Sequence, residues 1–197
     1  MSNTQSNYIM RVQCADQPGI VAAVATSLSN ADCNIEESAQ FNDQLSGHFF
    51  MRVVFKPLND NALGTFKENF ASTADTFDMN WKVTPQDEPV KTLILVSKTD
   101  HCLNDLLYRW RTKHLNIDIT SVISNHETNR ALVEDRDIPF YYEPVTPDTK
   151  ENQENNIRKI IDETDSELIV MARYMQIFSD EMSKHLSGRC INIHHSF

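Results

Sequence analysis

The hydrophobic pattern of the chain changes at Pro85-Gln-Asp-Glu-Pro89, where two prolines enclose three polar residues. Before this segment, apolar residues alternate with polar ones or recur at helical spacing, as in half-buried strands and amphipathic helices. After it, Leu93-Ile-Leu-Val96 is a continuous apolar run, which is typical of a parallel strand buried on both faces. We therefore expect two domains, at 1–84 and 91–197, joined by a linker at 85–90.

The first domain is predicted to contain four strands and two helices. The strands are expected over 8–14, 33–42, 49–55 and 79–84, and the helices over 18–30 and 63–70. This order is the split βαβ, or ferredoxin-like, βαββαβ plan. Asp16 is predicted to cap the first helix, and Ile35, Ala39 and Phe41 are predicted to lie on one side of their strand. One face of the predicted sheet carries no helix, so we expect self-association through this domain.

The second domain is predicted to alternate strands with helices. Further strands are expected over 117–124, 138–145, 167–172 and 189–194, and helices over 103–110, 148–164 and 179–186. Alternation of this kind predicts a doubly wound, mostly parallel sheet in an α/β domain. In the helix over 148–164 only Ile157, Ile160 and Ile161 are expected to face inward, and its charged run is interpreted as a solvated face.

Composition excludes several classes of function. The net charge is −10 and the isoelectric point is about 5.1, which argues against DNA or RNA as a partner. The N-terminus lacks the basic start and apolar run of a signal peptide, and no apolar stretch has the length of a membrane span. We expect a soluble cytoplasmic protein. The four cysteines are far apart in the sequence, so they are expected to be reduced core residues, and no metal site is predicted.

Glycine is scarce, with four residues that never share one short loop. A phosphate-binding loop or a dinucleotide fingerprint needs clustered glycines, because the backbone must approach the phosphates closely. ATP, GTP and nicotinamide cofactors are therefore poor candidates, and no cofactor is expected.

Polar residues follow the predicted strands of the second domain, at 97–100, 124–126, 172–175 and 192–195. The carboxyl ends of parallel strands meet at one edge of a sheet, where ligands bind. Asn192 and His194 are two residues apart and so face the same side of a strand. An amide and an imidazole so placed suit addition to a carbonyl. Three alternatives stay open. The pair Asn192 and His194 is structural, the adjacent histidines bind adventitious metal, or Met175, Ile177 and Phe178 are simply core residues.

A family resemblance rests on long stretches of the chain. Those of the second domain are VSKTDHCLNDLLYRWR (96–111), IDITSVISNH (117–126), DIPFYYEPVT (137–146), ELIVMARYMQIFSD (167–180) and SGRCINIHHSF (187–197). They resemble the folate-dependent formyltransferase family, and within it the formyltetrahydrofolate deformylases. The first domain resembles an ACT domain in ADQPGIVAAV (15–24) and CNIEESAQF (33–41). ACT domains commonly bind amino acids and regulate the enzyme to which they are attached.

The resemblance implies a hydrolase that converts 10-formyltetrahydrofolate to formate and tetrahydrofolate, in one-carbon metabolism, with formate supplied for purine synthesis. Asn192 matches the family's oxyanion-binding asparagine, and His194 matches its catalytic histidine. The pterin pocket is implied to be lined by Met175, Gln176, Ile177 and Phe178. An amino-acid effector is implied at Asp16, Gly19, Ile20, Asn34 and Ile35. Asn30-Ala-Asp32 departs from the ACT pattern, in which a glycine often closes the helix.

The related phosphoribosylglycinamide formyltransferases have a glycine-rich loop after the first strand for a substrate phosphate. The corresponding segment here, Ser97-Lys-Thr-Asp-His-Cys102, has no glycine and contains an acidic residue. The triplet His194-His195-Ser196 also resembles the deformylases, because the transferases typically have proline in its second place. Water as the acceptor therefore fits better than a phosphorylated amine.

The family's third catalytic residue is an aspartate on a later loop, which has no counterpart in this sequence. We therefore expect a truncated form that is inactive alone, because the members of a catalytic triad act as a unit. Two alternatives stay open, namely an enzyme that needs a complementing C-terminal piece and an amino-acid-binding ACT module with a vestigial catalytic half. The expected partners are a folate substrate, an amino-acid effector and further copies of the chain.

Overall fold

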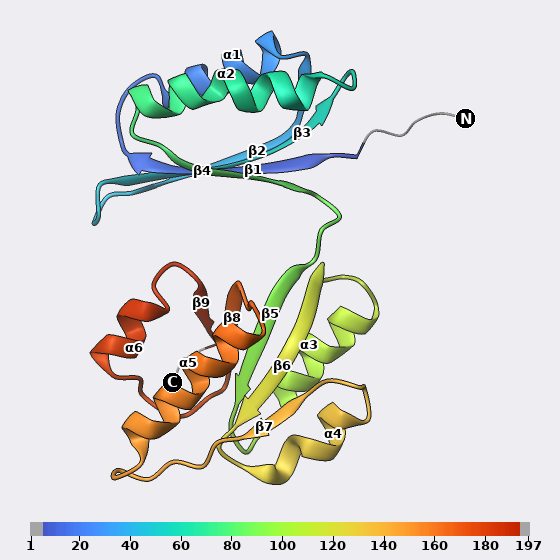
Figure 1. Cartoon of the computed structure of the whole chain (residues 1–197), viewed down its shortest axis with the longest axis vertical. Helices are drawn as coiled ribbons and strands as arrows, with labels where there is room; N and C mark the ends of the chain where they lie inside the picture. The colour runs from blue at the N-terminus through green and yellow to red at the C-terminus, as the bar shows by residue number, and fades with distance from the viewer. Residues whose placement is uncertain (1–5, 194–197) are drawn as a thin grey trace. The chain divides into compact units, whose positions relative to one another are not determined.

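The computed structural model describes residues 6–193 and divides the chain into two compact units, 1–88 and 89–197 (Figure 1). We call them the N-terminal and the C-terminal unit. Among the helices of residues 6–193, none combines the length and the apolar composition that crossing a membrane would require.

The N-terminal unit has the ferredoxin-like plan that the sequence predicts. Its elements are β1 (Tyr8–Ala15), α1 (Ile20–Asn30), β2 (Cys33–Asp43), β3 (His48–Pro57), α2 (Ala62–Thr76) and β4 (Asn80–Pro85). The strands pair antiparallel in the order β2-β3-β1-β4, and both helices lie over the same face of the sheet (Figure 1). The core lies between that face and the helices, because the apolar sides of β1 and β3 pair in register.

Aromatic rings fill much of this core. The rings of Phe55 and Phe66 are 5.4 Å apart, and those of Phe66 and Phe70 are 5.2 Å apart. Trp81 of β4 meets Phe70 edge-on at 5.1 Å. These contacts connect α2 to both β3 and β4, so burial of the rings fixes the helix on the sheet.

The start of α1 differs from the prediction. Asp16 does not cap the helix, since the helix begins at Ile20 and its N-cap residue is Gly19 with a φ of 97°. Only glycine adopts this backbone conformation without strain. The Asp16 carboxylate instead accepts a hydrogen bond from the Asn42 side chain of β2.

The prediction for β2 is wrong in its outer half. A β-bulge between Ile35 and Glu37 shifts the pairing with β3, and β2 is an edge strand. A shift of one residue exchanges the faces of all later side chains, so Ala39 is exposed and Phe41 is 64% exposed. Asp32, in the segment 30–32 where a glycine often closes the helix in ACT domains, adopts the left-handed conformation with a φ of 54°. Aspartate tolerates that conformation better than most residues, so the helix ends in the turn without glycine.

The C-terminal unit is a doubly wound α/β sheet, as predicted. Its strands are β5 (Val90–Val96), β6 (Ile117–Ser124), β7 (Phe140–Tyr142), β8 (Leu168–Ala172) and β9 (Cys190–Asn192). Its helices are α3 (His101–Arg111), η1 (Glu127–Asn129), α4 (Arg130–Glu134), α5 (Lys150–Glu163) and α6 (Asp180–His185). Every pair in the order β7-β6-β5-β8-β9 is parallel.

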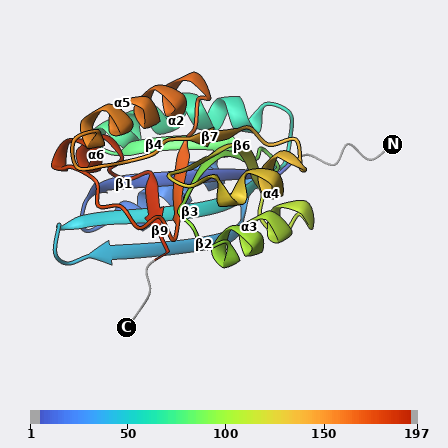
Figure 2. The same cartoon turned by 90° about the horizontal axis from the view of Figure 1, so that it is seen from below.

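The continuous apolar run of β5 supplies both cores of this unit. Leu93 and Leu95 pack under α5 and α6, whereas Ile94 and Val96 pack under α3 and α4. The two pairs of helices lie on opposite sides of the sheet (Figures 1 and 2). All four side chains are fully buried, as expected for the central strand of a sheet covered on both faces.

Two predictions for the C-terminal unit need correction. The strand expected over 138–145 is shorter, at Phe140–Tyr142. The charged run of α5 is not wholly solvated, because Gln153 and Glu154 are each only 4% exposed. Their side chains are buried because each has a polar partner outside the helix, the Glu143 carbonyl for Gln153 and Ser179 for Glu154.

The buried thiol of Cys33 gives the N-terminal unit a testable pH dependence. Burial, together with the neighbouring Asp32 carboxylate, raises the pKa of Cys33 to about 11. An unfolded cysteine ionises near pH 8.5, so the thiol stabilises the fold below that pH, and this contribution is lost as the pH rises towards 11. In chemical denaturation between pH 8 and 11, we expect the unfolding free energy of Cys33→Ala to fall by about 2–3 kcal/mol less than that of the unmodified chain. Equal losses in the two proteins would contradict this.

Candidate active site

The carboxyl ends of the parallel strands define the candidate active site. The chain runs from β5 outward to β6 and β7 on one side and then crosses to β8 and β9 on the other. Strand order therefore reverses between β5 and β8, and open α/β sheets bind ligands at such a point. The residues that follow β5, β6 and β8 meet there.

Ser97, directly after β5, connects three strand ends. Its Oγ donates to Oδ1 of Asn125, which follows β6, at 2.8 Å and accepts from the Met175 N–H, after β8, at 3.0 Å. Its carbonyl accepts from Nδ2 of the buried Asn129 at 2.9 Å. The sequence predicts that Ser97 lies at this edge of the sheet, but nothing local to position 97 shows which distant groups its hydroxyl meets.

The segment between β8 and α6 contains the predicted pterin-lining residues. Met175 is 65% exposed and Ile177 is 85% exposed, so the alternative that these two are core residues is wrong. Phe178 is half-buried against the core under α5 and α6, with its ring 5.8 Å from that of Tyr174. Gln176 is half-buried. The segment thus presents two large apolar side chains to solvent from an anchored backbone.

The far end of this segment is held by α5. The Glu154 carboxylate accepts hydrogen bonds from the Ser179 backbone N–H at 2.8 Å and from the Ser179 hydroxyl. The Ser179 hydroxyl in turn accepts from the Met182 N–H and so caps α6. Arg158 donates to Glu181 at 2.6 Å one turn further along α5. The burial of Glu154 could not be predicted, because an acidic run in the sequence does not show which carboxylate is buried.

Asn192 ends β9, the neighbour of β8, and is exposed. Asn192 pairs with Met171, and the Ile193 N–H donates to the Met171 carbonyl at 3.0 Å. Asn192 therefore lies at the same edge of the sheet as the segment after β8. His194 lies outside the described residues.

The segment after β5 also bears on substrate choice. Lys98, Thr99 and Asp100 are exposed, and Asp100 is the N-cap residue of α3. The Asp100 carboxylate accepts from the Asn104 side chain at 2.9 Å, which places an acidic group at the end of the helix where an anion would otherwise bind.

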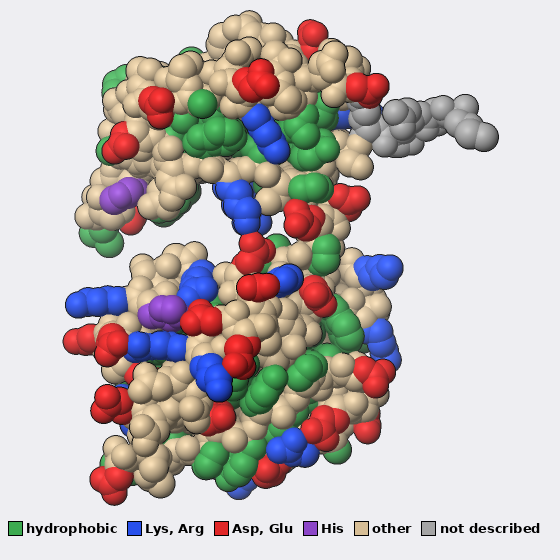
Figure 3. All heavy atoms as spheres, viewed as in Figure 1, with side chains coloured by type: hydrophobic (Ala, Val, Ile, Leu, Met, Phe, Trp, Pro, Cys, Tyr) green, Lys and Arg blue, Asp and Glu red, His purple; other side chains and the backbone are tan. Residues whose placement is uncertain are grey.

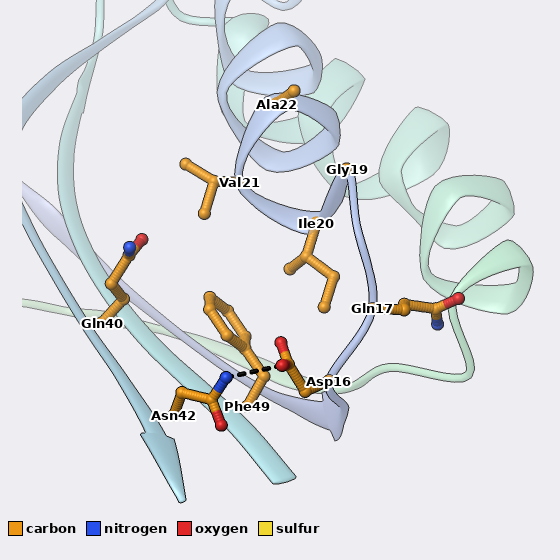
Figure 4. A pocket seen from close by; sticks show the side chains of 9 residues that line it. All are labelled: Asp16, Gln17, Gly19, Ile20, Val21, Ala22, Gln40, Asn42 and Phe49. Carbon is orange, nitrogen blue, oxygen red and sulfur yellow. Dashed lines mark hydrogen bonds between the residues drawn. The ribbon is translucent and has the colours of Figure 1, made fainter. Parts of the chain in front are cut away.

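A second candidate site lies in the N-terminal unit, at the start of α1. A pocket of about 580 Å³ is lined by Asp16, Gln17, Gly19, Ile20, Val21, Ala22, Gln40, Asn42 and Phe49 (Figure 4). Three of the five predicted effector residues, Asp16, Gly19 and Ile20, belong to this lining. Asn34 and Ile35 do not, because Asn34 bonds to Glu36 and Ile35 packs against the core of the unit. Gln40 and Asn42 were missed, because the bulge in β2 changes which side chains face α1.

The described residues also show how metal-ligating, titratable and charged side chains are arranged. No group of three or more His, Cys, Asp or Glu side chains within 6–193 is arranged to hold a metal ion. Burial raises the pKa of the Tyr174 hydroxyl and of the Cys190 thiol, so both stay protonated at neutral pH. On the part of the described surface that Figure 3 shows, acidic and basic side chains are interspersed on the C-terminal unit.

Comparison with known proteins places the chain in a family. The family model described as formyl transferase matches residues 90–197. The formyltetrahydrofolate deformylase of Corynebacterium sp. (strain P-1) is 40% identical over 196 residues, which cover 98% of this chain and 68% of that protein. The Bacillus subtilis deformylase is 41% identical over 188 residues, which cover 94% of this chain and 63% of that protein. The chain thus spans about two thirds of the length of these relatives.

Solved structures agree with this placement. A formyltetrahydrofolate deformylase from Burkholderia mallei has a TM-score of 0.88 and 38% identity, with 98% of this chain and 68% of that chain covered. A phosphoribosylglycinamide formyltransferase from Coxiella burnetii has a TM-score of 0.50 and 32% identity, with 54% of this chain and 52% of that chain covered. The deformylase match includes both units, whereas the transferase match covers about half of the chain. The chain therefore belongs to the formyltetrahydrofolate deformylase family.

Proposed function

We propose that this chain takes part in the hydrolysis of 10-formyltetrahydrofolate to formate and tetrahydrofolate. The observation that carries the proposal is the placement of Asn192 and the segment 175–178 on neighbouring strand ends, β9 and β8, at one edge of the sheet. The identity to deformylases across both units supports the same assignment.

In the proposed reaction, a water molecule gives up a proton as its oxygen forms a bond to the formyl carbon, which gives a tetrahedral oxyanion. The bond from that carbon to N10 of the folate then breaks, N10 takes up a proton, and the formic acid released ionises to formate. The Asn192 amide would donate a hydrogen bond to the oxyanion, where the developing charge is largest. We assign the proton transfer to His194, as the resemblance implies.

The pterin ring would bind against the segment 175–178. Met175 and Ile177 offer apolar surface, and the backbone between them offers polar groups for the edge of the ring. Water is the better acceptor than a phosphorylated amine, because the Asp100 carboxylate at the start of α3 would repel a phosphate at that position.

A chimera in which the final third of the Corynebacterium relative follows Phe197 tests the proposed reaction. We expect it to release formate from 10-formyltetrahydrofolate and the 197-residue chain to bind tetrahydrofolate. Formate is measured by a coupled assay and binding by calorimetry. Absence of both, from proteins shown to be folded, would contradict the proposal.

Asn192→Ala in this chimera tests the role of the amide. Loss of one oxyanion donor should lower kcat by about 10²–10³-fold and leave the affinity for tetrahydrofolate nearly unchanged. Asn155→Ala, at an exposed position of α5, is the matched control and should leave kcat unchanged. If Asn192→Ala weakened binding and left kcat intact, its assignment to the oxyanion would be wrong.

The pocket at the start of α1 favours a second function, the binding of an amino-acid effector. The Asp16 carboxylate could pair with the ammonium group of the ligand, and the uncapped N-terminus of α1 could bind its carboxylate.

We further propose self-association through the N-terminal unit, where Phe41 and Leu45 of the β2–β3 hairpin are 64% and 99% exposed.

Substitution of Asp16 tests the effector proposal. Calorimetry against a panel of the twenty amino acids should identify at least one ligand, and Asp16→Asn should weaken its binding by at least about tenfold because the ammonium group loses its charged partner. Asp75→Asn, exposed on α2, is the control and should bind normally. Equal affinity in Asp16→Asn and the unmodified chain would place the ligand elsewhere.

A further inference from the structure

We propose that Ser97 and Glu154 are positioning residues for folate binding, which hold the segment 173–179 in its binding conformation from both ends. This inference rests on the proposed function, because it takes the segment to be the pterin site. Neither residue was assigned a role by the resemblance, and the two lie 57 positions apart in the sequence.

The first anchor acts where the segment leaves β8. Arg173 adopts the left-handed conformation with a φ of 58°, which turns the chain sharply after the strand. The Met175 N–H that follows is held at 3.0 Å by the Ser97 hydroxyl, and Ser97 is only 4% exposed. The hydroxyl is itself fixed by donating to Asn125. Because the Ser97 hydroxyl donates its only proton to Asn125, its lone pairs are oriented to accept from the Met175 N–H.

The second anchor acts where the segment enters α6. The Glu154 carboxylate is 4% exposed and accepts from both the N–H and the hydroxyl of Ser179. Hydrogen bonds to an ionised group are about twice as strong as neutral ones. Between the anchors, Tyr174 and Phe178 pack together on the core.

The anchored segment leaves its middle available to a ligand. Within residues 6–193, the structure records no hydrogen bond to the backbone of Gln176 or Ile177. A flexible segment would have to be ordered on binding, at a cost in affinity, whereas a segment held at both ends is ordered in advance. Ser97 and Glu154 therefore act on affinity through the backbone of 175–178, without contacting the folate.

Two matched pairs of variants test this inference in the 197-residue chain. Ser97→Ala and Glu154→Gln remove the anchors. Ser121→Ala is the control for the first, because Ser121 is also fully buried in this sheet and its hydroxyl has no hydrogen-bond partner within the described residues. Glu151→Gln, exposed in the first turn of α5, is the control for the second. Each protein is measured for amide hydrogen exchange without ligand and for tetrahydrofolate affinity.

We expect Ser97→Ala to speed exchange of the Met175 amide and Glu154→Gln to speed exchange of the Ser179 amide, and each to raise the Kd for tetrahydrofolate by about 5–20-fold. Both controls should match the unmodified chain within twofold. Exchange that stays unchanged in the anchor variants would overturn the proposal, and so would faster exchange with an unchanged Kd, since the role would then be only structural. Absence of tetrahydrofolate binding by the unmodified chain would refute the proposed function first, and this inference with it.

Discussion

Burial of β5 on both faces is the constraint on which the C-terminal unit depends. Leu93 and Leu95 point to one core and Ile94 and Val96 to the other, and each buried side chain contributes on the order of 1.5–3 kcal/mol. The strand can satisfy both faces only if helices cover both. Each helix crosses from one parallel strand to the next in a right-handed sense, so the face that it covers depends on the direction in which the sheet grows. Helices on both faces therefore require later strands on both sides of β5. The reversal of strand order beside β5, and with it the candidate site, follows from this requirement.

The site itself depends on polar groups that follow the buried strands. Ser97 ends β5 at the point where the cores close, and its hydroxyl connects the ends of β6 and β8. The segment after β8 is therefore a fixed part of the sheet edge with two exposed apolar side chains, Met175 and Ile177. Asn192 stands on the next strand at that edge. The strands thus place the Asn192 amide and an apolar surface at the same edge of the sheet.

The fold was predictable from the sequence because its signals are local. Alternation in β1 and β3, helical stripes in α1 and α2, and the apolar run of β5 each follow from side-chain periodicity alone. The predictions were wrong where groups far away in the sequence determine which side chains are buried. The bulge after Ile35 reversed the faces of β2, and the burial of Glu154 depends on Ser179, which is 25 positions away. Asn192 was predicted from its place on a strand and by resemblance and 175–178 by resemblance, whereas Ser97 and Glu154 emerged only from the geometry.

A map of the residues that a folate perturbs tests whether it binds at the carboxyl ends of β8 and β9. Amide spectra of the isotope-labelled 22.7 kDa chain, recorded during titration with tetrahydrofolate, report each residue that the ligand perturbs. We expect the largest shifts on residues 175–178 and on Asn192, with little change around the pocket at the start of α1. Shifts centred on that pocket, or none at saturating tetrahydrofolate, would contradict a folate site at the carboxyl ends of β8 and β9.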